Sequence, residues 1–166
     1  MLRKSKVLIL VFSCILMATP YLEAELINLH APKNLLFTAT HDIDENPYFD
    51  WAVRQRSNPE KFEKAKIEYL IERVRTSPYA FIRNGSEYTA SQAAKHLGEK
   101  YRVRKEKIKT AEQFIQDVAS RSSVSGQPYM IKLVDGTSYP TEEIFTNELD
   151  VLELNLTETP SSPTSN

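Results

Sequence analysis

The sequence predicts an α+β fold in which helices dominate and two short β-hairpins interrupt them. Apolar residues recur at helical spacing after residue 60, as an amphipathic helix requires. Two turn signals, Asn84-Gly85 and Asp135-Gly136, each separate short segments suited to strands. The predicted order is helix, hairpin, helix, helix, hairpin, helix, in a single domain over residues 60–154.

The first helix of this domain is predicted from Glu60 to Arg75, and Pro78 ends it. One face of it carries Ile67, Leu70, Ile71 and Val74. The segment 79–83 then has strand character, and the chain turns at Asn84-Gly85 and returns through 86–88.

Two further helices are predicted from their N-terminal signals. Thr89 with Gln92, and Thr110 with Gln113, have the spacing of capping boxes, and apolar stripes follow both. A second hairpin is also expected, with its first strand over 129–134 and its turn at Asp135-Gly136. Pro140 and Thr141 then open the last helix.

The N-terminal residues 1–24 are predicted to be a secretory signal peptide. Arg3, Lys4 and Lys6 precede an apolar run over 7–17, and Ala24 is a small residue at the predicted cut. The run is about half of the ~20 residues that span a bilayer, so no permanent membrane helix is expected after cleavage. A lipoprotein anchored through Cys14 is the minor alternative. We therefore expect an exported protein, periplasmic or secreted.

Cleavage would change the charge and remove the single cysteine. The cut takes away Arg3, Lys4, Lys6 and Glu23, so 21 basic and 22 acidic side chains become 18 and 21, a charge of −3. Without Cys14 the chain has no disulfide, thiol nucleophile or thiolate ligand. Negative charge and export together argue against nucleic acid as a partner.

Two polar extensions are expected around the domain. Residues 25–59 are predicted to be an N-terminal arm with a short helix near 47–54, because Asn46-Pro47 has the pattern of an N-cap followed by proline. Residues 155–166, rich in Thr, Ser and Pro, are predicted to be a disordered tail.

The candidate catalytic residues are His96, Ser123 and Ser125. A serine nucleophile needs a base within hydrogen-bond reach, and His96 is the histidine that the predicted domain offers. The chain contains no G-x-S-x-G elbow or phosphate-binding glycine loop. The serines equally suit hydrogen bonding to exposed backbone at a helix end, which is the interpretation we favour.

No metal or cofactor is expected. His96 and Glu99 share a helix face, but two ligands do not make a site. The acidic segment 42–46 matches the start of a calcium loop and then fails, because Pro47 stands where glycine is required.

A basic ridge over 95–109 is the main charge feature. It includes Arg104 and Lys107, which we name as candidate binding residues for an anionic envelope component or an acidic protein. A solvated helix face is the simpler alternative.

Several motifs in this order resemble the YfeK-like family of small exported bacterial proteins of unknown function. They are the segment 81–85 (FIRNG), Glu87-Tyr88, His96-Leu97, the segment 109–112 (KTAE) and the segment 122–129 (SSVSGQPY). The resemblance covers about residues 60–152 and implies export and bacterial origin, but no activity. It singles out Arg83, His96 and the Ser122–Tyr129 loop as a signature to examine together. Family members often carry a cysteine before the FIRNG-type segment, where this chain has Thr76, Ser77 and Pro78.

The function expected from the sequence is a non-enzymatic binding or interaction module of the bacterial envelope. The alternative is a small hydrolase or anionic-ligand site built from His96, Arg83 and the Ser122–Tyr129 loop.

Overall fold

The helices and strands alternate as the sequence predicts. The computed structural model describes Ile43 and residues 45–160. The elements are α3 (Pro47–Gln55), α4 (Pro59–Thr76), β1 (Ala80–Arg83), β2 (Ser86–Thr89), α5 (Ala90–Arg104), α6 (Ala111–Phe114), the π-helix η1 (Ile115–Ala119), β3 (Met130–Lys132), β4 (Ser138–Pro140) and α7 (Thr141–Glu158). The helix-dominated α+β class and the order of the hairpins are confirmed.

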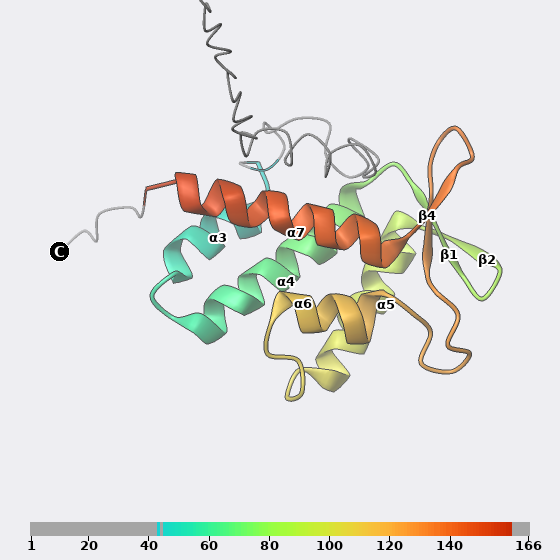
Figure 1. Ribbon diagram of the computed structural model, residues 1–166, viewed down its shortest axis with the longest axis horizontal. Helices are drawn as coiled ribbons and strands as arrows, with labels where there is room; N and C mark the ends of the chain where they lie inside the picture. The colour runs from blue at the N-terminus through green and yellow to red at the C-terminus, as the bar shows by residue number, and fades with distance from the viewer. Residues whose placement is uncertain (1–42, 44, 161–166) are drawn as a thin grey trace, which may run out of the picture. The chain divides into compact units, whose positions relative to one another are not determined.

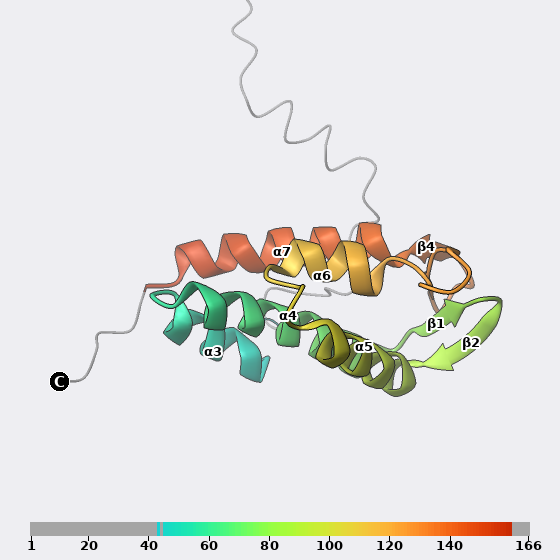
Figure 2. The same cartoon turned by 90° about the horizontal axis from the view of Figure 1, so that it is seen from below.

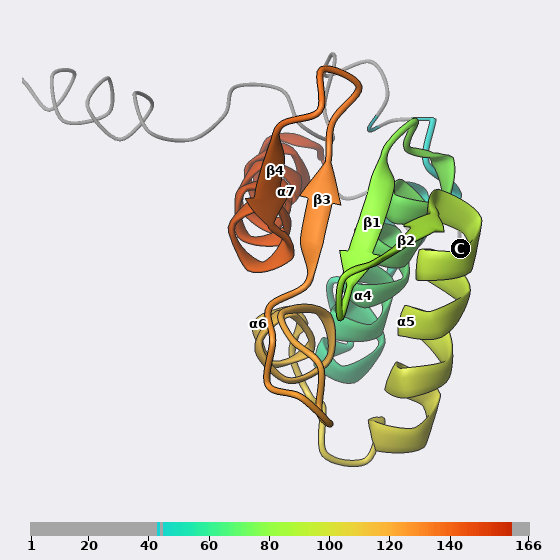
Figure 3. The same cartoon turned by 90° about the vertical axis from the view of Figure 1, so that its right-hand side faces the viewer.

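The two predicted hairpins join into one antiparallel sheet with the strand order β2-β1-β3-β4. Its centre is the β1–β3 pair, in which Phe81 lies opposite Ile131. The β1–β2 turn has positive φ at Asn84 (50°) and Gly85 (77°), the combination that matches the twist of a two-residue hairpin. Figure 3 shows the sheet face-on, with the helices behind it.

The helices pack around α4, which contacts α3, α5, α6 and α7. Figures 1 and 2 show α7 lying along α4, with the strands gathered at one end of these helices. Fully buried large side chains from different elements fill the core: Tyr69, Phe114, Ile131 and Phe145. The Phe114 ring meets the Phe145 ring edge-on at 6.4 Å between centroids, which ties α6 to α7.

The helix starts follow the predicted caps. Asn46 accepts a hydrogen bond from the Tyr48 backbone, Thr89 and Gln92 form the complete capping box, and Thr110 accepts from the Gln113 backbone. The π-helix η1 continues α6 and was not predicted. Its buried residues Ile115, Val118 and Ala119 still face the core as the apolar pattern indicates.

The packed part of the chain extends past residues 60–154 at both ends. The short helix α3 is present, but Phe49, Ala52 and Val53 are buried in the same core as α4, and so is Ile43. A domain beginning at residue 60 therefore omits a packed helix. At the other end α7 runs to Glu158, and Leu156 in its last turn is buried. The predicted signal peptide 1–24, its cleavage at Ala24, Cys14, the arm up to residue 42 and residues 161–166 lie outside the described residues.

One buried carboxylate joins α7 to α4. Glu148 is fully buried, and its Oε1 accepts hydrogen bonds from Arg73 Nε at 2.8 Å and from the Tyr69 hydroxyl at 3.2 Å. Burial raises the pKa of Glu148 to about 8, against the opposing effect of the Arg73 charge. This cluster is a structural link at the helix interface and lies apart from the residues that line the pocket described next.

Candidate functional site

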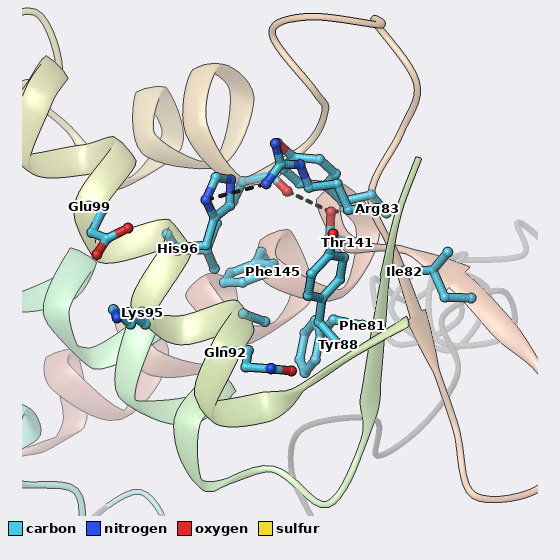
Figure 4. A pocket seen from close by; sticks show the side chains of 14 residues that line it. Phe81, Ile82, Arg83, Tyr88, Gln92, Lys95, His96, Glu99, Thr141 and Phe145 are labelled. Atoms are coloured by element: carbon cyan, nitrogen blue, oxygen red, sulfur yellow. Dashed lines mark hydrogen bonds between the residues drawn. The ribbon is translucent and has the colours of Figure 1, made fainter. Parts of the chain in front are cut away.

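Arg83 and His96 are brought together by the junction between the first hairpin and α5. Arg83 is the last residue of β1, and β2 ends at Thr89, the residue that caps α5. No loop separates β2 from α5, so the hairpin and the helix are held in a fixed relation. Arg83 Nη1 lies 3.5 Å from His96 Nδ1, at the long limit of a hydrogen bond. Figure 4 shows the two side chains reaching toward one another from opposite walls.

The contact closes one end of a pocket of about 300 Å³ between the sheet, α5 and α7. Rings and aliphatic side chains make most of its wall: Phe81, Ile82, Tyr88, Leu97, Tyr129 and Phe145. Polar side chains also line it: Arg83, Gln92, Lys95, His96, Glu99 and Thr141. A mainly apolar concavity with a few polar groups gathered at one place is the usual form of a small-molecule site.

The Arg83–His96 contact determines where the histidine proton lies. A guanidinium has no acceptor atom, so His96 Nδ1 must accept and the ring proton belongs on Nε2. Burial lowers the pKa of His96, and the nearby charges of Arg83 and Lys100 lower it further. His96 is therefore neutral near pH 7.

Two N–H donors of this pair have no acceptor. Arg83 Nε and His96 Nε2 are both covered from solvent, and neither has a hydrogen-bond partner among the described residues. A buried donor left without an acceptor costs about 1–3 kcal/mol.

The cations of the predicted basic ridge differ in their contacts. His96, Lys100 and Arg104 are spaced four residues apart on one face of α5, and the two cations point toward η1. Lys100 Nζ donates to the carbonyls of Val118 at 2.6 Å and Arg121 at 2.9 Å, and Arg104 Nη1 donates to the carbonyl of Asp117 at 3.0 Å. The two cations thus satisfy helix-end carbonyls, whereas Lys107 is exposed.

Lys100 also supports the wall of the pocket. Its Nζ lies 5.1 Å from the centroid of the Tyr129 ring, and that ring meets His96 edge-on at 6.4 Å. Burial, followed by the charges of Arg104 and Arg83, lowers the pKa of Lys100 to about 8. The ammonium therefore remains mostly charged at pH 7 and holds η1, Tyr129 and α5 together.

The serine loop makes a contact with the hairpin turn. Ser122 is buried and its hydroxyl accepts from the backbone of Val124 and Ser125, while the Ser125 hydroxyl donates to Asn84 Oδ1 at 2.6 Å. Ser123 and Ser125 are exposed, and neither is among the residues that line the pocket. The side-chain partner found for His96 is Arg83, so these contacts give no support to a serine nucleophile.

Several lining residues were not predicted as part of a site. Tyr88 and Phe145 come from β2 and α7, and sequence patterns give no indication that these segments meet, whereas Tyr129, just before β3, ends the Ser122–Tyr129 loop that the family resemblance singled out. Tyr88 is the one with a usable signal, because it is a large aromatic residue on a strand whose four residues are all exposed.

Across Ile43 and residues 45–160, no three His, Cys, Asp or Glu side chains are grouped as a metal site would require. Within the same part of the chain, none of the helices combines the length and apolar character needed to cross a membrane.

Fold and pocket together define a small helix-dominated α+β domain with a mainly apolar pocket closed by an arginine–histidine contact. The chain belongs to a family of unknown function (DUF5329), whose sequence profile matches residues 61–153. It is 36% identical over 74 residues to the uncharacterised protein YfeK of Salmonella typhimurium strain LT2. That alignment covers 44% of this chain and 62% of the relative, so the chain spans less than two thirds of the relative's length. No solved structure matches the chain.

Proposed function

We propose that this protein is an exported, non-enzymatic binding module of the bacterial envelope. The observation that carries the proposal is the pocket: about 300 Å³ of mainly apolar space, with Arg83 and His96 among the polar side chains that line it. Such a site suits a small ligand with an apolar body and a hydrogen-bond-accepting group.

Binding is favoured over hydrolysis by the surroundings of His96. A general base needs its nucleophile within about 3 Å or one water molecule away. The hydrogen-bonding neighbour of His96 is Arg83, a residue that binds but does not attack. Ser125 is bonded to Asn84 instead. The hydrolase alternative stays a prediction.

Export rests on the basic and apolar character of residues 1–24. The test is to express the full chain in a bacterium and measure the mass and first residue of the protein in the periplasmic fraction. We expect a chain that begins at Glu25. Recovery of an acylated chain beginning at Cys14 would establish the lipoprotein alternative, and an uncleaved cytoplasmic chain would contradict export.

Ligand binding is tested on the protein recovered in this way, with a library of small fragments and backbone amide NMR spectra. We expect some fragments to shift the resonances of Phe81, Arg83 and His96. Ala93→Trp would fill the pocket from α5 and abolish these shifts, because Ala93 lines it. Val103→Trp is the matched control, since Val103 is 83% exposed on the same helix. A library that shifts no pocket resonance would overturn the proposed function.

A further inference from the structure

The charges around the pocket restrict the kind of ligand that fits it. Arg83 contributes one positive charge, and His96 is neutral near pH 7. Lys95 and Glu99, also lining residues, are exposed and opposite in sign, so their charges offset each other. Lys100, which is mostly charged at pH 7, lies behind the lining against the Tyr129 ring, so the charges around the pocket favour an anion over a neutral or cationic ligand.

The donor pattern agrees with a planar anion that has two acceptor oxygens. The planar guanidinium of Arg83 lines the pocket, and its contact with His96 Nδ1 is long, at 3.5 Å. A carboxylate offers two oxygens with four lone-pair sites and forms planar, paired contacts with a guanidinium. A carboxylate in the pocket would take the guanidinium N–H groups in place of this long contact, and its hydrogen bonds would join two groups of opposite charge.

The apolar part of the pocket lining indicates that the body of the ligand is apolar, and the volume limits its size. Beyond the Arg83–His96 end, the lining is formed mainly by Phe81, Tyr88, Leu97, Tyr129 and Phe145. An apolar cavity of about 150 Å³ is enough for a benzene molecule. The pocket, at about 300 Å³, has space for one ring and a short chain that carries the charged group.

From this arrangement we infer that the ligand is a monocarboxylate with a compact apolar body, its carboxylate paired with the Arg83 guanidinium beside His96 and its body against the rings of Phe81, Tyr88 and Phe145. The inference rests on the proposed binding function and adds the chemical class of ligand. It also assigns roles. Arg83 supplies the charge and the N–H donors, neutral His96 adds no second charge, and Lys100 positions the His96 ring by anchoring Tyr129 and η1.

The experiment compares three probes that share a phenyl ring: 3-phenylpropionate, 3-phenylpropionamide and phenylphosphonate. Each is titrated at pH 7 into the recovered protein and followed by the amide resonances of Arg83, His96 and Phe81. We expect the carboxylate to bind at least about tenfold more tightly than the amide, as the loss of hydrogen bonds to an ionised group implies. It should also bind more tightly than the phosphonate.

Variants locate the contact. Arg83→Gln should weaken 3-phenylpropionate by about tenfold or more and leave 3-phenylpropionamide almost unchanged. Arg102→Gln is the matched control, because Arg102 is exposed on α5 and does not line the pocket. The comparison of acid with amide needs no substitution, so it decides the question even if Arg83→Gln fails to fold.

The outcomes separate the two proposals. Equal binding of acid and amide at the pocket, or tighter binding of phenylphosphonate, would overturn the monocarboxylate class and leave the binding function standing. If neither the three probes nor the fragment library shifts a pocket resonance, the binding function itself is overturned.

Discussion

Arg83 Nη1 and His96 Nδ1 lie 3.5 Å apart, and this contact joins the end of a strand to the second turn of a helix that begins seven residues later. The contact places the His96 ring, with its proton on Nε2, beside the Arg83 guanidinium. The two groups repel as cations, and this is one reason why the histidine stays neutral. The chemistry of the pocket follows from this pair.

The first prediction concerns the titration of His96. Burial first, and the Arg83 and Lys100 charges next, should hold its pKa below the ordinary value of 6.5. As pH falls through 6.5, the unfolded chain binds the proton before the folded chain does, so the stability contributed by neutral His96 is lost toward acid pH. His96→Gln should make the unfolding midpoint in urea less sensitive to pH between 7 and 5.

NMR titration of the ring resonances provides the direct measurement, with His96→Gln used to assign them. Arg83→Gln should raise the pKa of His96, because one of the lowering charges is removed. A normal pKa for His96 in the wild-type chain would contradict the buried, neutral state.

The second prediction concerns the buried Glu148 cluster. Glu148→Ala removes the carboxylate that accepts from Arg73 and Tyr69, and we expect a loss of about 3–5 kcal/mol in the free energy of unfolding. The double variant Arg73→Met/Glu148→Leu should lose less than Glu148→Ala, because the buried guanidinium is then replaced together with the carboxylate that it binds.

Chemical denaturation measures both variants of this cluster, with Glu143→Ala on the same helix as the control. That control should change stability by no more than about 0.5 kcal/mol. Equal losses for Glu143→Ala and Glu148→Ala would show that the buried contact contributes little.

The third prediction concerns Lys100 as the anchor of the serine loop. Lys100→Met removes the donors to the Val118 and Arg121 carbonyls, so hydrogen exchange should accelerate in the segment 119–129. Lys95→Met, an exposed lysine on the same helix, should leave exchange in that segment unchanged. Equal hydrogen-exchange protection of the segment 119–129 in the two variants would contradict an anchoring role for Lys100.

The fourth prediction concerns the start of α5. Thr89→Ala removes the hydroxyl that caps the Gln92 backbone and should destabilise the protein by about 1 kcal/mol. Thr89→Ser keeps the hydroxyl and should restore most of that loss. Because the cap also fixes where β2 ends, Thr89→Ala is expected to shift the His96 resonances, whereas Thr89→Ser is not.

The elements themselves were predictable where a local signal exists. Asn84-Gly85 predicts a tight turn because both residues tolerate positive φ, and both adopt it. Thr89, Thr110 and Asn46 predict helix starts because each can accept an orphan backbone N–H, and each does so.

The pocket was predictable only in part. The family resemblance placed Arg83 and His96 in one signature, but their contact depends on the direct passage of β2 into α5, which no spacing rule gives. The pairing of β1 with β3 joins strands of four and three residues, too short for a pattern to specify a partner. The apolar wall depends on that pairing, because it brings Tyr129 and Phe145 against the first hairpin.

The central pair of the sheet also affects how the domain assembles. Phe81 pairs with Ile131, 50 residues later, and α5, α6 and η1 lie between them in the chain. Joining strands so far apart costs loop-closure entropy, which is repaid only when the intervening helices are packed. The pocket wall therefore exists in the completely folded chain and in no smaller unit. A ligand that occupies the pocket will stabilise the folded chain by mass action, so its binding is measurable as a higher midpoint of thermal unfolding for the whole domain.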